Sequence, residues 1–296
     1  MTHSVYIPLL IHKFLRKLLP WIEQQRGGWR LRNWLLDPDR VRFPKNSILA
    51  SLETGGTLWI NPNDGMARYI FYRGLWEPVL ARHFAAEVRD GDTVLDVGAN
   101  AGQYTVIAGR RVGVSGRVIA VEINPECLEL LHRNRRLCQP VRVDVLTVAA
   151  WSENAELQMI REGADATGLT SVREGIGASD GITRVNARRL DEALAEIGCL
   201  HADIVKLDIE GAELPALKGL SGMLRDAPPR AIYCEVEDDH CAAFRYSGDG
   251  VFSYLDRFGY TAYAFRRSDG TMIPWTGGMS ECDYLNMYYF KRHGIQ

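Results

Sequence analysis

The chain of 296 residues is long enough for one large domain with an extension, and its 46% hydrophobic residues suffice for a full core. The formal net charge of -2 and the isoelectric point near 6.4 give no global basic field, so composition does not suggest a nucleic-acid-binding protein. The six cysteines show no C-x-x-C pair and no His/Cys ligand spacing, which argues against a zinc site and a disulfide framework. Reduced thiols in a cytoplasmic protein fit this pattern best.

The first predicted element is a basic amphipathic helix within "YIPLLIHKFLRKLLPWI". Helical spacing places the apolar residues on one side: Leu10, Ile11, Phe14, Leu15, Leu18 and Leu19. The basic residues lie largely on the other side: His12, Lys13, Arg16 and Lys17. Such a helix packs on its own domain, joins a second subunit in a homo-oligomer, or makes peripheral contact with an anionic membrane, here the inner membrane surface. We expect no secretory signal and no membrane-spanning segment.

Two regions follow from the patterns along the chain. Residues 1–65 are expected to form an adaptor region, which combines this helix with a Trp-rich stretch and a short β pair that turns at Gly55 and Gly56. Residues 66–296 alternate between strand and helix patterns, which is typical of βαβ units and a mostly parallel sheet. The segments "GYTAYAF" and "LNMYYF" are predicted to close the sheet as an antiparallel edge hairpin.

The stretch "VLDVGANAGQYT" predicts a cofactor-binding loop between a buried strand and a helix. Its glycines, Gly98 and Gly102, let the backbone approach a ligand closely. A dinucleotide site would read G-x-G-x-x-G and hold a pyrophosphate, which the carboxylate of Asp96 would repel. That acid suits a cationic ligand, and S-adenosylmethionine (SAM) carries both an ammonium and a sulfonium group. Glu122 ends the next predicted strand, where an acid that binds ribose hydroxyls belongs.

Between residues 69 and 237 the chain resembles the FkbM-type family of SAM-dependent methyltransferases. Four blocks carry the resemblance: "RGLWEP", "VLDVGANAGQYT", "GLTSV" and "DIVKLDIEGAELPALKG". The resemblance implies an α/β class I methyltransferase fold, with a Rossmann-like, mostly parallel seven-stranded sheet and helices on both faces. It implies SAM as the cofactor and, usually, O-methylation of a hydroxyl on a sugar or a natural product.

The same resemblance assigns the cofactor contacts by motif position. The methionine end would meet Asp96, Gly98, Asn100 and Gly102; the ribose would meet Glu122; and adenine would lie near Ala149 and Ala150. Tyr104 and Asp208 are also expected to bind the cofactor. Trp151 departs from the smaller residue expected there and is interpreted as core rather than as a stacking partner of adenine. Trp76 and Glu77 are either a packing pair at a helix start or a pocket lid.

The segment "IVKLDIEGAE" puts charges on what otherwise reads as a buried strand, with an edge strand as the ordinary alternative. If this strand lies beside that of Asp96, its acids meet the cofactor crevice and Asp208 faces the methyl group. Methyl transfer to a hydroxyl requires alignment and removal of a proton. The candidate catalytic residues are Asp208, Glu210, Glu235 and His240, with Lys206 as an ion-pair partner.

Several features have two readings. His240 is either a catalytic residue or a surface loop residue. Glu213 is expected to support the start of its helix, with contact to the substrate as the alternative. Nothing in the pattern fixes a ligand geometry for Mg²⁺ or Ca²⁺, so no metal is predicted. The polar insert at 163–181 is interpreted as a lid, because Thr170 and Ser171 belong to a family block.

The main hypothesis is therefore a SAM-dependent O-methyltransferase whose acceptor is a small molecule or a glycan, lipid-linked if the amino-terminal helix meets a membrane. A nicotinamide-dependent oxidoreductase is disfavoured by Asp96 and by the missing G-x-G-x-x-G pattern. The alternative from another class is a non-catalytic SAM-binding or scaffold protein that assembles through its amino-terminal helix.

Overall fold

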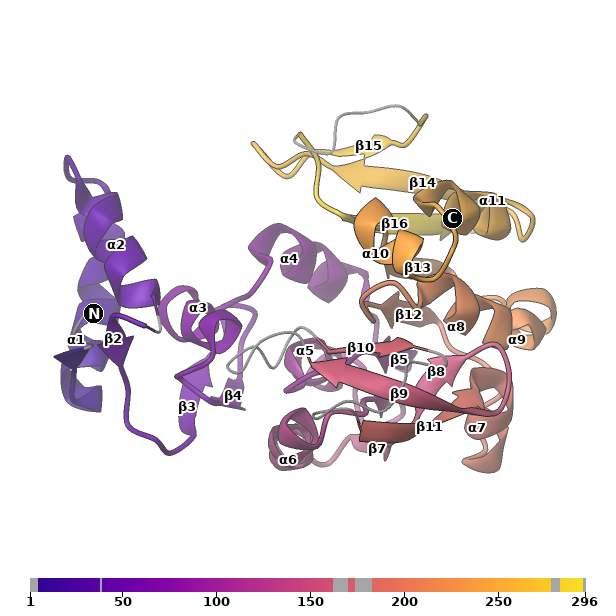
Figure 1. Cartoon of the computed structure of the whole chain (residues 1–296), viewed down its shortest axis with the longest axis horizontal. Coiled ribbons are helices and arrows are strands. Elements are labelled where there is room, and N and C mark those ends of the chain that lie inside the picture. Colours follow the sequence, from indigo (N-terminus) through magenta and orange to yellow (C-terminus); the bar gives the residue numbers. More distant parts are fainter. Residues whose placement is uncertain (1–4, 38, 162–169, 174–182, 278–282, 295–296) are drawn as a thin grey trace.

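The computed structural model describes residues 5–37, 39–161, 170–173, 183–277 and 283–294 (Figure 1). The amino-terminal region contains β1 (Val5–Tyr6), α1 (Leu9–Glu23), α2 (Gly28–Leu36), β2 (Val41–Arg42), β3 (Ile48–Ser51), β4 (Thr57–Ile60) and α3 (Gly65–Arg73). The predicted helix is α1, and the predicted β pair is the antiparallel pair β3–β4. Gly55 and Gly56, which join these strands, both have positive φ. The boundary at residue 65 is not marked by a separate core, since Leu19 and Phe43 belong to the same hydrophobic cluster as Phe84.

The two predicted sides of α1 are wrong in detail. His12 and Leu19 are buried, whereas Leu10 and Phe14 are exposed. The buried side is therefore centred between the predicted faces. His12 is buried because its ring stacks on Phe43 at a centroid distance of 3.4 Å.

The central sheet has the strand order β15-β14-β16-β13-β12-β5-β6-β7. Its parallel part consists of β5 (Thr93–Val97), β6 (Arg117–Val121), β7 (Arg142–Leu146), β12 (Ile204–Leu207) and β13 (Ala231–Glu235). The antiparallel part is built by β14 (Tyr260–Phe265), β15 (Met272–Pro274) and β16 (Met287–Arg292). The predicted mostly parallel α/β sheet is thus present.

The two segments of the predicted hairpin pair antiparallel as β14 and β16, but the number of strands and the strand at the edge differ from the prediction. Among the described residues the sheet has eight strands, because the short β15 adds to β14 at the edge. β16 lies inside the sheet, between β13 and β14. Its first four residues are buried on alternate faces, with Met287 and Tyr289 in one core cluster and Tyr288 and Phe290 in the other. A strand that is apolar on both faces belongs inside a sheet rather than at its edge.

Helices cover both faces of the sheet, as predicted. Val94 and Ile204 pack in one cluster with Phe84 of α4 (Pro78–Glu87) and Ile107 of α5 (Gln103–Gly109). The other face packs against α7 (Leu190–Glu196), α8 (Glu213–Gly219), α9 (Ser221–Asp226) and α11 (Gly248–Asp256). The remaining helices are α6 (Pro125–Asn134), the 3-10 helix η1 (Arg135–Cys138) and α10 (Asp238–Ala243).

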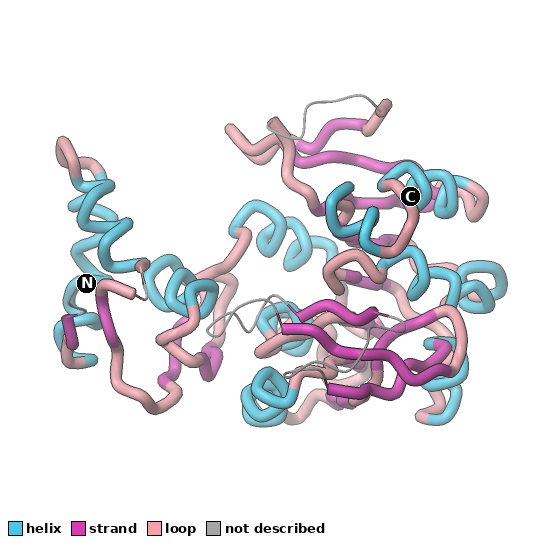
Figure 2. The backbone as a smooth tube through the Cα atoms, in the orientation of Figure 1, coloured by secondary structure: helices cyan, strands magenta, loops and turns pink. Residues whose placement is uncertain are grey.

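A second sheet, which the sequence did not predict, has the order β10-β9-β11-β8 (Figure 2). Its strands are β8 (Ala149–Trp151), β9 (Ala155–Arg161), β10 (Thr170–Arg173) and β11 (Thr183–Arg189). Residues 170–172 of the "GLTSV" block belong to β10, which pairs antiparallel with β9. The rest of the predicted lid, 163–169 and 174–181, lies outside the described residues, so the lid stays a prediction.

Candidate active site

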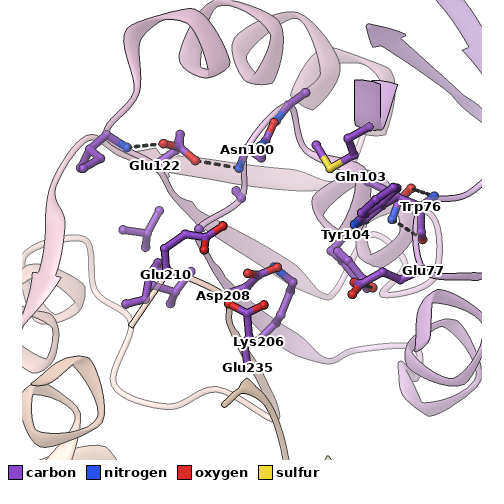
Figure 3. A pocket seen from close by; sticks show the side chains of 18 of the residues that line it. Trp76, Glu77, Asn100, Gln103, Tyr104, Glu122, Lys206, Asp208, Glu210 and Glu235 are labelled. Atoms are coloured by element: carbon purple, nitrogen blue, oxygen red, sulfur yellow. Dashed lines mark hydrogen bonds and ion pairs between the residues drawn. The ribbon is translucent and has the colours of Figure 1, made fainter. Parts of the chain in front are cut away.

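The site lies at the carboxyl ends of β5 and β12, which are adjacent parallel strands with Asp96 opposite Lys206. From β5 the chain continues to β6, and from β12 it continues to β13, which lies in the opposite direction along the sheet. Open α/β sheets bind ligands at such a reversal of strand order. A pocket of about 950 Å³ is present here (Figure 3). This volume is in the range of small-molecule and cofactor sites.

Glycine at position 98 is required by a close approach between the two strand ends. Gly98 has φ +77°, and a Cβ built on it would lie 1.8 Å from the backbone oxygen of Asp208. Gly102 also has positive φ, at +94°, and a Cβ there would meet the side chain of Leu131 at 2.8 Å. Because L side chains disfavour this conformation, the glycine spacing follows from the geometry of the loop.

Glu122 fixes the shape of that loop. Its carboxylate accepts hydrogen bonds from the backbone N–H groups of Asn100, Ile123 and Asn124, each at 2.7 Å. Burial raises the pKa of Glu122, while the hydrogen bonds from Asn124 and Asn100 act against this shift. Both Glu122 and Asn100 line the pocket, as Figure 3 shows. Glu122 therefore shapes the loop and presents an acid to the pocket at the end of β6.

Ion pairs of a buried lysine connect β5 and β12. The Nζ of Lys206 lies 3.9 Å from Oδ1 of Asp96 and 3.0 Å from Oδ2 of Asp208. The hydroxyl of Thr105 donates to Oδ2 of Asp96 at 2.6 Å. Burial disfavours the charged form of Lys206, but the carboxylates of Asp208 and Asp96 outweigh it and raise its pKa above the ordinary value. Lys206 is therefore charged and neutralises part of the acidity of the site.

Asp96 and Gly102 were predicted to line the methionine end, yet neither is among the residues that line the pocket. Asp96 is fully buried below it, between Thr105 and Lys206. Its carboxylate accepts the hydrogen bond from Thr105 and faces Lys206, the residue opposite it on β12. A direct contact of Asp96 with a ligand stays a prediction. Gly98, Asn100 and Tyr104 do line the pocket.

Ala149 and Ala150, which were expected near adenine, line the pocket from β8, and their contact with adenine stays a prediction. Trp151, the next residue, is buried in a hydrophobic cluster with its ring 6.0 Å from that of Phe244. The interpretation of Trp151 as core is therefore confirmed. Val172 of β10 also lines the pocket, so the "GLTSV" block contributes to the site.

Trp76 and Glu77 form a wall of the pocket at the start of α4. The backbone N–H of Trp76 donates to Oε1 of Gln103 at 2.8 Å, and the Gln103 amide donates back to the Trp76 carbonyl at 3.2 Å. The hydroxyl of Tyr104 donates to Oε2 of Glu77 at 3.2 Å. Burial, and secondly the nearby Asp208, raise the pKa of Glu77 to about 7. Both residues stand at the start of α4 and line the pocket, and their function as a lid stays a prediction.

Glu235 contributes a second carboxylate beside Asp208, from the end of β13. Its Oε1 accepts a hydrogen bond from the amide of Asn286 at 2.8 Å. Burial and then the charge of Asp208 raise the pKa of Glu235 well above its ordinary value. Asn286 and Arg267, which also line the pocket, were missed at the sequence level because they come from the carboxyl-terminal segment outside the family blocks.

His240 was expected on a surface loop, but it lies in α10 and is part-buried. Its Nδ1 is 3.1 Å from Oε2 of Glu210, and Glu210 lines the pocket while His240 does not. The ligand atoms of Glu210, Glu235 and His240 lie within 4.8 Å of one another, so these side chains could hold a cation. Nothing in this geometry tests the prediction that no metal is required.

Glu213 has a structural role, but its carboxylate holds the turn before α8 (Glu213–Gly219) and not the helix start, which was the expectation. It is 1% exposed, and its Oε1 accepts hydrogen bonds from the backbone N–H groups of Ile209 and Gly211. Gly211 has φ +97°, and a Cβ there would lie 2.4 Å from the carbonyl oxygen of His240. Glu213 therefore ties down the turn that carries Asp208 and Glu210 into the pocket.

Comparison with known proteins decides the family. The sequence model of the "Methyltransferase FkbM domain" matches residues 96–262, which is more than half of the chain. The chain belongs to the FkbM methyltransferase family. It is 25% identical over 197 residues to the hexuronic acid methyltransferase AglP of Haloferax volcanii, with 66% of this chain and 77% of that protein covered.

Two further similarities are more limited. This FkbM protein is 28% identical over 201 residues to the AMB antimetabolite synthetase AmbE of Pseudomonas aeruginosa; the match covers 56% of this chain but only 9% of that protein. A TehB-like SAM-dependent methyltransferase from Corynebacterium glutamicum is similar in structure, with a TM-score of 0.41 and 15% identity over 76% of this chain and 93% of that chain.

The site fits SAM, the cofactor of this methyltransferase family. The pocket combines the glycine loop after β5 with seven acidic residues: Asp39, Asp64, Glu77, Glu122, Asp208, Glu210 and Glu235. This acidic lining suits a ligand that carries an ammonium and a sulfonium, and it would repel a pyrophosphate. The expectation of a SAM site rather than a nicotinamide site therefore agrees with both the geometry and the family.

Proposed function

We propose that this methyltransferase methylates a hydroxyl oxygen of a sugar or glycan. The observation that carries the proposal is the pair of carboxylates, Asp208 and Glu235, which line the pocket from the neighbouring strands β12 and β13. A hydroxyl must lose its proton when its oxygen is methylated, and a carboxylate can accept that proton. The similarity to a protein named as a hexuronic acid methyltransferase supports a sugar as the acceptor.

The cofactor would be held by residues at the ends of three strands: Gly98 and Asn100 after β5, Glu122 after β6, and Ala149 and Ala150 in β8. When bound, SAM supplies a methyl group on a positively charged sulfur. Tyr104 supports this site from α5, through its hydrogen bond to Glu77 and its ring, which lies 4.9 Å from the Lys206 ammonium.

The two carboxylates have different surroundings and, in this proposal, different roles. Asp208 is held by the ion pair with Lys206, which fixes its orientation, so it positions the acceptor hydroxyl. Glu235 is the proton acceptor, because burial and the neighbouring acids make its carboxylate more basic than usual. A cationic cofactor in the pocket favours the ionised form of Glu235 before the proton moves. Glu210 and His240 form their own pair beside them.

The test is incubation of the purified chain with methyl-labelled SAM and a panel of hydroxylated sugars that includes uronic acids, with the product analysed by NMR. The expected product carries the label on oxygen, as a methyl ether. Asp208→Asn and Glu235→Gln should lower turnover by about a hundredfold or more, and the loss of SAM affinity measured by calorimetry should be much smaller. A label on nitrogen or carbon would overturn the proposal. SAM binding without transfer to any hydroxylated acceptor would instead favour the non-catalytic scaffold.

A further inference from the structure

The amino-terminal helix α1 exposes a row of large apolar side chains. Leu10 is 79% exposed, Phe14 is 61% exposed and Trp21 is 63% exposed. At 100° per residue these three positions fall within a narrow sector of the helix surface, and Ile11 and Leu18 widen it on one side. Exposed apolar side chains gathered in this way mark a surface for binding rather than the ordinary scatter of single residues.

The orientation of α1 is fixed by contacts on its other side. His12 and Leu19 are fully buried, and the His12 ring stacks on Phe43. The guanidinium of Arg16 donates to the carbonyl oxygen of Ser51 at 3.1 Å. Because the opposite face is anchored through these residues, the helix cannot rotate to bury Leu10 and Phe14 against its own domain.

Further aromatic residues are exposed close by in the sequence. Tyr6, just before α1, is 61% exposed, and Trp29, at the start of α2, is 54% exposed. Figure 1 shows α1 and α2 side by side at the end of the molecule away from the strands β14–β16. Tyr and Trp are the side chains that favour the interface between a bilayer and water.

The charges of this segment point to the chemistry of its partner. Residues 1–36 contain six Lys or Arg residues and one acid, although the whole chain has a formal charge of -2. The single acid, Glu23, is paired with Arg73 at 2.6 Å. Lys13 and Lys17 are exposed, and around the helix they lie next to the apolar row. An apolar stripe bordered by lysines is typical of a helix that lies in the surface of an anionic membrane.

We propose that the exposed face of α1 docks this methyltransferase on an anionic phospholipid surface, with Leu10, Phe14 and Trp21 entering the acyl boundary and Lys13 and Lys17 at the phosphates. A second copy of the chain is a poorer occupant. In a two-fold dimer the same patch meets itself, so the lysines of both copies would face each other. None of the helices in the described part of the chain has the length and apolar character to cross a bilayer, so the contact is peripheral.

The docking face and the active site share a structural element. α1 packs on α3, and Met66 and Ile70 of α3 line the pocket. The proposed surface therefore lies on the same amino-terminal region that walls the site. A membrane-held acceptor, such as a lipid-linked sugar, fits this arrangement, but the docking itself does not depend on the nature of the acceptor.

The test is flotation of the full chain with vesicles of phosphatidylcholine alone and of phosphatidylcholine with phosphatidylglycerol. We expect binding to the anionic vesicles that weakens as salt increases. The double variant Leu10→Asp/Phe14→Asp should lower that binding more than about tenfold, because both side chains would bring charge to the acyl boundary. Lys13→Glu/Lys17→Glu should lower it by about twenty-fivefold or more, since the loss of each lysine alone costs about fivefold.

Matched controls are available on the same chain. Val114 and Leu200 are 77% and 73% exposed and lie outside the amino-terminal region, so Val114→Asp/Leu200→Asp should leave vesicle binding unchanged. All variants should keep the parent melting temperature, since the altered side chains are exposed. Equal binding of the parent and the Leu10/Phe14 variant would overturn the proposal. So would a dimer, seen by sedimentation without lipid, that the Leu10/Phe14 variant abolishes; that result would assign the face to a second copy.

Discussion

The ammonium group of Lys206 lies between two carboxylates, 3.0 Å from Asp208 and 3.9 Å from Asp96. Lys206 is 2% exposed and Asp96 is fully buried, so these opposite charges lie in the interior of a parallel sheet. Charges in such a position are stable only as a group, because removing one partner leaves the others uncompensated.

Lys206→Met should therefore lower the free energy of unfolding by about 3–5 kcal/mol, which is typical of breaking a buried ion pair. Urea denaturation measures this change. The double variant Lys206→Met/Asp96→Asn should recover part of the loss, because the deepest unpaired charge is then gone. A Lys206→Met protein as stable as the parent would show that the lysine does not balance the buried acid.

Gly98→Ala should destabilise the protein by about 3 kcal/mol or more, because the added Cβ must displace the backbone oxygen of Asp208 as well as adopt positive φ. Gly198→Ala is the matched control: Gly198 has φ +67°, and nothing lies within 4 Å of a Cβ there. Its effect should be limited to the strain of the left-handed conformation, about 1 kcal/mol. Thermal unfolding of the two variants separates the cost of the steric clash from the cost of the backbone strain. Equal losses in the two variants would contradict the close approach of the strand ends.

SAM affinity should increase with pH up to about 7 and stay constant above it. The pKa of Glu77 is raised to about 7 in the pocket, so this carboxyl is partly protonated near neutrality. A cationic ligand favours the ionised form, and binding therefore releases a proton below that pH. Calorimetry in buffers of different ionisation enthalpy would measure the release. Glu77→Gln should reduce both the proton release and the pH dependence; an unchanged pH profile would show that another group titrates.

Glu213 should make the protein less stable as pH rises from about 4.5 to 7. Burial raises the pKa of this carboxyl from 4.5 to about 7, so the folded state holds a proton that the unfolded chain loses. Its stabilising contribution is full below about 4.5 and is lost toward pH 7, by up to about 3 kcal/mol.

Glu213→Gln keeps a side-chain oxygen for the N–H groups of Ile209 and Gly211 and removes the ionisation. As pH rises over this range, the parent should lose unfolding free energy relative to the variant, which has no ionisable group at this position. Urea denaturation at several pH values measures it. A difference that stays constant with pH would contradict a raised pKa at this position.

The sequence by itself determined the α/β class, the loop after β5 and the family. These features depend on short stretches of sequence. Apolar periodicity indicates which segments are strands and helices, and glycine at positions 98 and 102 indicates a backbone conformation that other residues disfavour. The acids at the strand ends were also visible, because parallel strands bring their carboxyl ends to one edge. Trp151 was correctly interpreted as core, since apolar runs are short-range patterns. Glu213 was predicted to support its helix, whereas its carboxylate binds the preceding turn.

Only the tertiary structure decided which charges neutralise each other and which reach the pocket. Asp96 and Lys206 are separated by more than a hundred residues, and their pairing depends on strand order and register. The second sheet, the inner position of β16 and the contributions of Asn286 and Arg267 also depend on long-range packing. Likewise, periodicity showed that α1 is amphipathic, but the contacts of His12 decided which side is buried. A helical pattern fixes relative positions on a helix, and only its neighbours decide which of its faces meets the core.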